Sequence, residues 1–130
     1  MLPLRGVFEV AIRVRDLARS EAFYRDVLGL TPGLRDERRH WLFLWVGSAG
    51  MVVLQEDPAN WVPQHFAFTV DETELQRAAT LLEEKGVPVL GPVRQEWMQA
   101  TSFYFTDPDG HDLELCAPAR QGQGPEDGAA

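Results

Sequence analysis

Residues 107–115 read Asp-Pro-Asp-Gly-His-Asp-Leu-Glu-Leu, and this stretch decides the fold prediction because it joins two strands through a tight turn. Asp-Pro-Asp-Gly favours a turn, since proline fixes φ and glycine accepts a positive φ. Beyond the turn, Leu113 and Leu115 alternate with Asp112 and Glu114, which is typical of a strand with one buried face. The stretch therefore predicts a final strand that directs Glu114 away from the core.

The chain carries this kind of unit twice. Residues 8–14 (FEVAIRV) and 64–70 (QHFAFTV) both alternate apolar with polar positions, and each is followed by a helix-like stretch that ends at a glycine, Gly29 or Gly86. Further strand-like segments follow in both copies. Such internal repetition indicates a duplicated half-domain, and aligning the two openings places Glu9 over His65.

Each copy predicts one strand, one helix and two or three further strands. The fold class is therefore α+β, with two repeated βαβββ modules, residues 5–57 and 63–117, forming a half-open mixed β-barrel with the helices outside. We expect helices from Asp16 to about residue 28 and over about 72–85, and a strand at 87–90 that Gly91-Pro92 interrupts. The aromatic residues expected beneath the helices are Trp41, Phe43, Trp45, Phe66, Phe68, Phe103 and Phe105.

Length and composition narrow the possible functions. The 130 residues predict a single domain over residues 1–117, and residues 118–130 have too little apolar surface to fold, so we expect a flexible tail. A net charge of −8 argues against nucleic acid and anionic membrane surfaces as partners. One cysteine excludes an internal disulfide, and no apolar run suits a membrane span, so a cytoplasmic location is expected. The sheet edges and apolar residues of so small a domain predict a homodimer.

Three polar side chains occupy strand positions turned away from the predicted helices: Glu9, His65 and Glu114. Carboxylates and imidazoles bind metals, and three protein ligands with open positions suit a catalytic metal site. Glu114 lies four residues after the turn glycine Gly110. The same count from the turn glycine of the first copy, Gly50, reaches the apolar residue Leu54. The alternatives are that Glu9 is solvated or paired with a basic neighbour, that His65 is structural, and that Glu114 is an ordinary exposed strand residue.

Over residues 5–117 the chain resembles the vicinal oxygen chelate superfamily, which includes glyoxalase I, fosfomycin-resistance thiol transferases, extradiol dioxygenases and bleomycin-binding proteins. The resemblance rests on motif order, and residues 102–111 (SFYFTDPDGH) look most similar to the fosfomycin enzymes. It implies metal ligands on the first strand of each module and on the last strand, at Glu9, His65 and Glu114. Glu9 stands where a histidine is usual, so this ligand set departs from the family pattern.

Further candidates concern the substrate. Ser102 and Tyr104 are expected to hydrogen-bond a substrate anion, and Tyr104 and Glu9 are the catalytic candidates. The resemblance implies a basic substrate contact at Arg94, while Trp61 and Trp97 lie in predicted loops where they would line a cavity mouth. The alternatives are a tyrosine with a solvated hydroxyl, an exposed loop arginine and tryptophans without a ligand.

Two functions stay open. In the first, a divalent metal on Glu9, His65 and Glu114 supports a glyoxalase-like or fosfomycin-resistance-like isomerisation or addition on a small oxygen-bearing substrate. In the second, a metal-free cavity sequesters a small molecule or antibiotic, as the bleomycin-binding relatives do. Two carboxylates and one imidazole form a hard ligand set, which favours Mn, Fe or Mg relative to Zn or Ni. The substrate, the reaction and whether the site lies within one chain or across a dimer stay undecided by the sequence.

Overall fold

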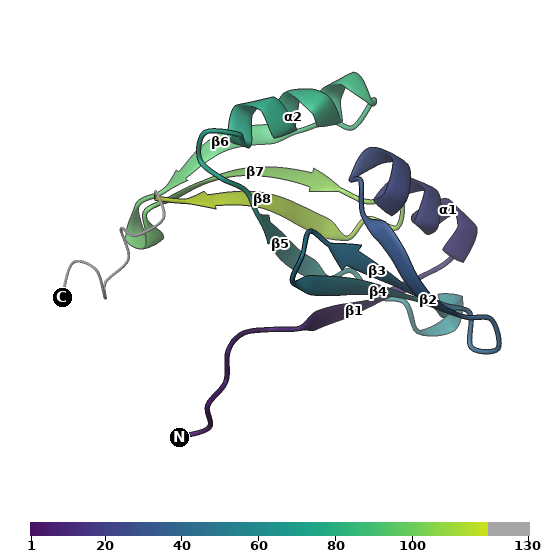
Figure 1. Ribbon diagram of the computed structural model, residues 1–130. Coiled ribbons are helices and arrows are strands. Elements are labelled where there is room, and N and C mark those ends of the chain that lie inside the picture. Colours follow the sequence, from purple (N-terminus) through teal and green to yellow (C-terminus); the bar gives the residue numbers. More distant parts are fainter. Residues whose placement is uncertain (120–130) are drawn as a thin grey trace. The chain divides into compact units, whose positions relative to one another are not determined.

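The computed structural model describes residues 1–119. It divides the chain into two compact units, Met1–Pro63 and a second unit that begins at Gln64. We call them module 1 and module 2 and describe each by itself (Figure 1). The predicted tail, residues 118–130, lies outside the described residues from position 120 onward, and Pro118 is the last residue of the final strand.

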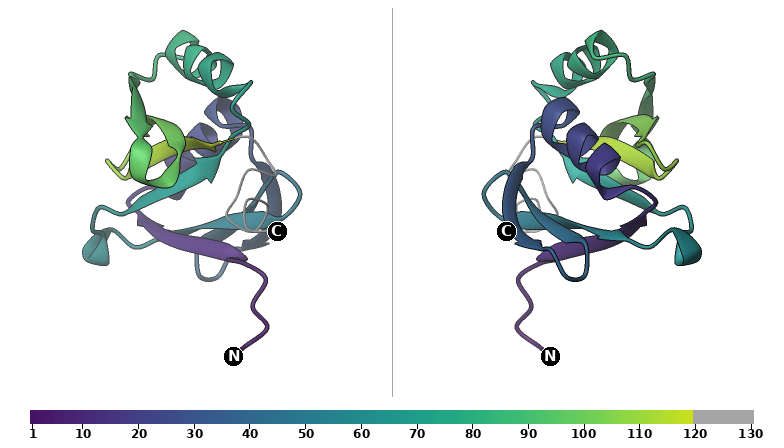
Figure 2. Two further views of the ribbon diagram at one scale, coloured as in Figure 1. Left: turned by 90° about the vertical axis from the view of Figure 1, so that its left-hand side faces the viewer. Right: turned by 90° about the vertical axis from the view of Figure 1, so that its right-hand side faces the viewer.

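Module 1 contains one four-stranded mixed sheet and one helical segment. Its elements are β1 (Glu9–Val14), α1 (Leu17–Ala22), the π-helical η1 (Phe23–Val27), β2 (Thr31–Asp36), β3 (Trp41–Val46), β4 (Gly50–Glu56) and the 3-10 helix η2 (Pro58–Asn60). The strand order is β1-β4-β3-β2, with β1 parallel to β4 and the other pairs antiparallel. The chain before β1 runs outward from the sheet of its module (Figure 2).

Module 2 repeats this plan. Its elements are β5 (His65–Thr69), α2 (Leu75–Glu84), β6 (Leu90–Gln95), the 3-10 helix η3 (Glu96–Met98), β7 (Ala100–Thr106) and β8 (Asp112–Pro118). The order β5-β8-β7-β6 and the parallel β5–β8 pair match module 1 strand for strand. The predicted α+β class and the two βαβββ modules are therefore confirmed.

The helices begin and end close to the predicted positions. The Asp16 carboxylate accepts the N–H of Arg19 at 3.0 Å, which caps α1, and Gly29 follows the helical segment with φ +78°. The final turn before it is π-helical, which the sequence pattern does not indicate. The second helix begins at Leu75 rather than near residue 72, because the N–H of Glu74 donates to the carbonyl of Asp71 in a turn.

The core of module 1 lies between α1 and one face of the sheet. In the strand register Ile12 pairs with Leu54 and Leu54 with Leu42, and these three buried side chains form one row beneath the helix. The prediction that Trp41, Phe43 and Trp45 lie beneath the helix is wrong. They occupy the alternate positions of β3 and therefore the opposite face, where Trp45 is 38% exposed.

The cause of this error is the composition of β3. All six of its residues are apolar (WLFLWV), so alternation does not distinguish its two faces. The compact leucines match the leucine and valine positions of β4, whereas tryptophan is rarely buried completely.

The core of module 2 follows the prediction. Leu113, Leu115, Phe103 and Phe105 are buried and share a face, and Phe66 and Phe68 pair with the two leucines. Leu75, Ala79 and Leu82 form the buried stripe of α2. Helix and sheet both contribute to a small hollow lined by Leu75, Gln76, Thr101, Phe103 and Ala117, which places α2 over this face.

A bulge interrupts an outer strand in each module. The register shifts between Pro32 and Arg35 in β2 and between Leu90 and Val93 in β6. The sequence predicts a strand at 87–90 that ends at Gly91-Pro92, whereas the observed strand β6 begins at Leu90. It continues through Gly91-Pro92 because the bulge accommodates both residues. Gly91 has φ +137°, and a Cβ atom there would lie 2.8 Å from the Ser102 carbonyl oxygen, so this position requires glycine.

Candidate metal and substrate site

The helix-free face of a module is the sheet face opposite its helix. In module 2 this face is polar: β5 contributes His65, β8 contributes Glu114 and β7 contributes Ser102 and Tyr104. The register places Glu114 between Ala67 and Tyr104, and Cys116 between Thr69 and Ser102. Glu114 is 6% exposed although it carries a carboxylate, so the strand pairing holds a buried acid among polar neighbours.

His65 and Glu114 face one another at this site. Nε2 of His65 lies 3.3 Å from Oε1 of Glu114, and the two side chains are 54% and 8% exposed. The other ring nitrogen, Nδ1, lies 3.1 Å from the carbonyl oxygen of Asp112. A carbonyl oxygen only accepts hydrogen bonds, so Nδ1 carries the proton. In the neutral ring, Nε2 then presents a lone pair toward the carboxylate.

Ser102 forms a hydrogen bond to the second oxygen of the Glu114 carboxylate. Its hydroxyl donates to Oε2 of Glu114 at 2.6 Å, and its side chain is completely buried. The substrate contact predicted for Ser102 stays a prediction, and in the structure its hydroxyl bonds the glutamate. Glu114 thus has one oxygen bonded within the protein and one turned toward His65.

Tyr104 has a partner that the sequence analysis did not identify. The side-chain amide of Gln95 donates to the phenolic oxygen of Tyr104 at 2.6 Å. Gln95 belongs to β6 and pairs with Ala100, which places it on the helix-free face. The bulge earlier in β6 hides this alternation from a sequence reading. With its oxygen accepting from Gln95, the Tyr104 O–H is available as a donor.

Glu9 is the first residue of β1 and pairs with Met51 on the helix-free face of module 1. It is exposed, and within residues 1–119 its carboxylate forms no hydrogen bond or ion pair, while Arg13 pairs with Asp57 at 3.5 Å. The position equivalent to Glu114 is not Leu54. Glu114 pairs with Ala67, and in module 1 the corresponding Ala11 pairs with Val53.

The count from the turn glycine fails by one residue. In the strand register Met51 corresponds to Asp112, so Gly50 corresponds to His111 rather than to Gly110. A shift of one residue moves a side chain to the other face, and Leu54 accordingly lies beneath α1. The equivalent position is still apolar, because Val53 replaces the carboxylate.

The remaining substrate candidates lie in three different settings. Arg94 pairs with Thr101, so it belongs to the helix-covered side of β6, and its guanidinium bonds Glu96 at 2.6 Å. Trp61 follows η2 in module 1, where Arg15 lies 4.2 Å above its ring. Trp97 lies in η3 and is 83% exposed.

A buried cluster of possible metal ligands, Asp107, Asp109 and His111, lies in the turn before β8. Two of its polar atoms bond backbone N–H groups of and beside the turn. Oδ1 of Asp107 accepts the N–H groups of Asp109 and His111, both at 2.9 Å, and Nδ1 of His111 accepts the N–H of Gln64 at 2.9 Å. His111 of this cluster therefore connects the turn to the residue before β5.

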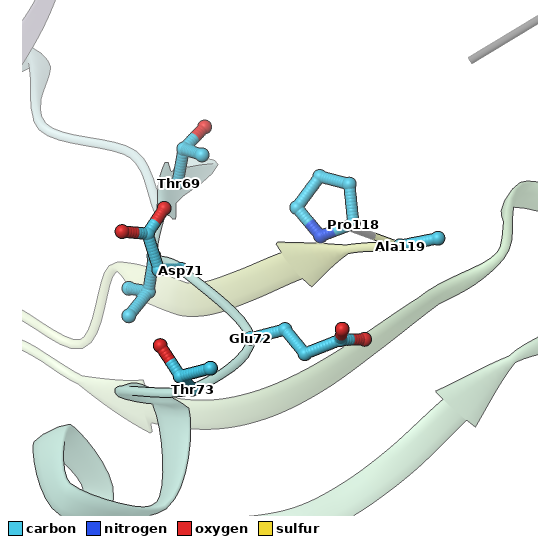
Figure 3. A pocket seen from close by; sticks show the side chains of 7 residues that line it. Thr69, Asp71, Glu72, Thr73, Pro118 and Ala119 are labelled. Carbon is cyan, nitrogen blue, oxygen red and sulfur yellow. The ribbon is translucent and has the colours of Figure 1, made fainter. Parts of the chain in front are cut away.

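A hollow of about 260 Å³ lies at the C-terminal end of β5, whereas His65 lies at the N-terminal end of this strand (Figure 3). Its lining residues are Thr69, Val70, Asp71, Glu72, Thr73, Pro118 and Ala119. Its lining contains neither His65 nor Glu114, so this hollow does not coincide with the polar centre of the helix-free face.

Comparison with known proteins places this arrangement in a family. Residues 6–115 match the model of the Glyoxalase/Bleomycin resistance protein/Dioxygenase superfamily. Glutathione transferase FosA of Serratia marcescens is 32% identical over 118 residues, covering 86% of this chain and 80% of that protein. Metallothiol transferase FosB of Staphylococcus epidermidis is 32% identical over 119 residues, covering 88% and 82%.

A solved structure is more similar still. Integron cassette protein HFX_CASS4, from the mobile metagenome of the Halifax Harbour sewage outfall, is 54% identical. It superposes with a TM-score of 0.85 and covers 88% of this chain and 99% of its own. Within residues 1–119, no helix has the length and apolar character needed to cross a membrane.

Proposed function

Because the chain belongs to the Glyoxalase/Bleomycin resistance protein/Dioxygenase superfamily, we propose that it is a divalent-metal-dependent transferase acting on a small oxygen-bearing substrate. The proposed metal ligands are Glu9, His65 and Glu114. The curated relatives named above are a glutathione transferase and a metallothiol transferase, which supports thiol transfer over a glyoxalase-type isomerisation.

The observation that carries this proposal is the pair formed by His65 and Glu114. A neutral imidazole lone pair and a carboxylate oxygen 3.3 Å apart repel one another unless a proton or a cation lies between them. Two ligands bound at about 2.1 Å to one ion lie roughly 3.0–3.4 Å apart at octahedral or tetrahedral angles. The donor set and its spacing therefore suit a divalent ion.

A bound divalent ion would polarise a substrate oxygen and stabilise the negative charge that develops there. In the proposed reaction a thiol sulfur forms a bond to a substrate carbon, and the carbon–oxygen bond at that carbon breaks. The electron pair of the broken bond remains on the oxygen, which receives the proton lost by the thiol. Tyr104, held through its oxygen by Gln95, would donate its O–H to this oxygen or to an anionic group of the substrate.

A second candidate function has its own supporting observation. The helix-free face of module 1 carries the aromatic row Trp41, Phe43 and Trp45, which suits stacking on a flat or apolar molecule. This favours sequestration of a small molecule without turnover. The metal content of the purified protein distinguishes the candidates, since a metal-free protein that binds no added Mn²⁺ supports sequestration.

Calorimetric titration with Mn²⁺ and Zn²⁺ tests the proposed ligands. His65→Ala and Glu9→Ala should each weaken the binding of both metals by removing one ligand, and Glu9→His should shift the relative affinity toward Zn²⁺. Glu37→Ala removes another exposed carboxylate of module 1 and serves as the matched control. If Glu9→Ala binds both metals as the wild type does, Glu9 is not a ligand.

We also propose a homodimer, since several large apolar side chains are exposed on the described residues. Leu4, Phe8, Leu90 and Trp97 are 81%, 58%, 74% and 83% exposed. Light scattering at micromolar concentration tests this, and a monomeric mass would contradict it. The cytoplasmic location stays a prediction.

A further inference from the structure

On the helix-free face of module 2, the hydroxyl of Ser102 bonds a proposed metal ligand. Its Oγ lies 2.6 Å from Oε2 of Glu114, and both side chains are buried. A hydroxyl donor to an ionised carboxylate forms a strong hydrogen bond at this distance. Because β7 and β8 pair at Tyr104–Glu114 and Ser102–Cys116, the backbone holds the two side chains together.

The two oxygens of Glu114 therefore have different surroundings. Oε2 accepts from Ser102, and Oε1 faces Nε2 of His65 at 3.3 Å. A carboxylate that binds a cation through both oxygens would have to share Oε2 between the cation and the Ser102 hydroxyl, or turn Oε2 away from that donor. Sharing weakens the strong hydrogen bond, and rotation leaves a buried hydroxyl without an acceptor, so both alternatives cost free energy.

We propose that Ser102 is a positioning residue that restricts Glu114 to one coordinating oxygen, Oε1. This inference rests on the proposed function, since it assumes that Glu114 binds a metal. Coordination through one oxygen leaves a further position on the metal for water or for a substrate oxygen, which a chelating substrate requires. Ser102 thereby influences how many substrate atoms the site can accept.

The test counts the water molecules on bound Mn²⁺ by the magnetic relaxation of solvent protons. In Ser102→Ala, Oε2 loses its donor and should join the metal, so the count should fall by about one water. Ser102→Thr retains the hydroxyl and should retain the wild-type count. Thr101→Ala removes a hydroxyl from the opposite face of the same strand and is the matched control.

An unchanged water count in Ser102→Ala, with Mn²⁺ bound, would overturn the inference and leave the proposed function intact. If the wild type itself binds no Mn²⁺, the metal-dependent function fails, and this inference fails with it. Ser102→Cys provides a second test should the alanine variant fail to fold, because a thiol is a weak donor of similar shape. It should also lose water, and a wild-type count in that variant contradicts the proposal.

Discussion

The helix-free faces of the two modules share one strand register but carry different chemistry. Where module 2 has Glu114 and Tyr104 paired across β8 and β7, module 1 has Val53 and Phe43 paired across β4 and β3. Only the first strands remain alike, with the exposed polar residues Glu9 and His65 in equivalent places. One backbone plan thus supports an apolar surface in one module and a polar surface, with a histidine beside a glutamate, in the other.

The largest expected effect comes from making the two faces alike at one position. Val53 is 1% exposed, so Val53→Glu places a carboxylate in an apolar setting without the hydroxyl donor that Glu114 has. We expect a loss of about 3 kcal/mol or more in the free energy of unfolding at pH 7. Urea denaturation measures it, with Val53→Gln as the uncharged control. Wild-type stability would mean that module 1 can also hold a carboxylate there.

The orientation of β3 predicts that a leucine matters more than a tryptophan. Leu42→Ala removes a completely buried side chain beneath α1 and should cost about 3 kcal/mol. Trp45→Ala removes a larger but 38% exposed side chain from the helix-free face and should cost less, about 1–2 kcal/mol. Thermal unfolding of both variants measures the difference. A larger loss for Trp45→Ala than for Leu42→Ala would indicate that the aromatic residues of β3, and not the leucines, lie in the core.

The two bulges should differ in their tolerance of a methyl group. Gly91→Ala forces a positive φ on alanine and places Cβ 2.8 Å from a backbone oxygen, so we expect a loss of about 2 kcal/mol. In Gly33→Ala of β2 the new Cβ would lie 3.2 Å from the Trp45 side chain and 3.3 Å from the Phe43 carbonyl oxygen, contacts that a small shift of the neighbours relieves. Its effect should stay below about 1 kcal/mol, as measured by chemical denaturation. Equal losses would indicate that the two bulges are equivalent.

The smallest effect concerns an ion pair that joins helix α1 to β2. Glu21 accepts from Arg35 at 2.7 Å and from Arg25 at 2.9 Å. The hydrogen bond from Arg35 holds the pKa of the Glu21 carboxyl below its ordinary value of 4.5. The contribution of ionised Glu21 to the free energy of unfolding is therefore fully present above pH 4.5. It is lost as the pH falls through the lowered pKa of the folded state.

Glu21→Gln should cost about 0.5–1 kcal/mol near neutral pH and nothing at strongly acidic pH. The control is Glu74→Gln in module 2, whose pair with Arg77 lies within one helix segment and is exposed on both sides. Because exposed ion pairs contribute little, that variant should lie within about 0.5 kcal/mol of the wild type at pH 7. Denaturation at pH 7 and pH 3 compares them, and a Glu21→Gln effect that does not change with pH would contradict the assignment.

Much of the fold follows from alternation and turn chemistry. In β1, β5 and β8 apolar and polar residues alternate, so the faces of Glu9, His65 and Glu114 could be predicted from the sequence. The glycines at positions 29 and 86 likewise predicted the ends of the helical segments. These signals are local, because each depends only on residues within one element.

The remaining features depend on pairing between elements. The sequence WLFLWV is apolar throughout, so only the partners of β3 decide which of its side chains lie beneath α1. In the strand register Gly50 corresponds to His111 and not to Gly110, so counting from the two glycines misplaced the equivalent of Glu114 by one residue. The bonds from Ser102 to Glu114 and from Gln95 to Tyr104 depend on register, which a single sequence does not reveal.

The bulges in β2 and β6 have a consequence for the assembly of a duplicated chain. A tandem repeat places two similar sheets in one polypeptide, which invites strand exchange between copies and growth into larger aggregates. Each outer strand carries an interrupted register and a proline that lacks an N–H donor, Pro32 or Pro92. An approaching strand would find no continuous ladder there. The two bulged strands thus protect a duplicated chain against the addition of further strands at these edges.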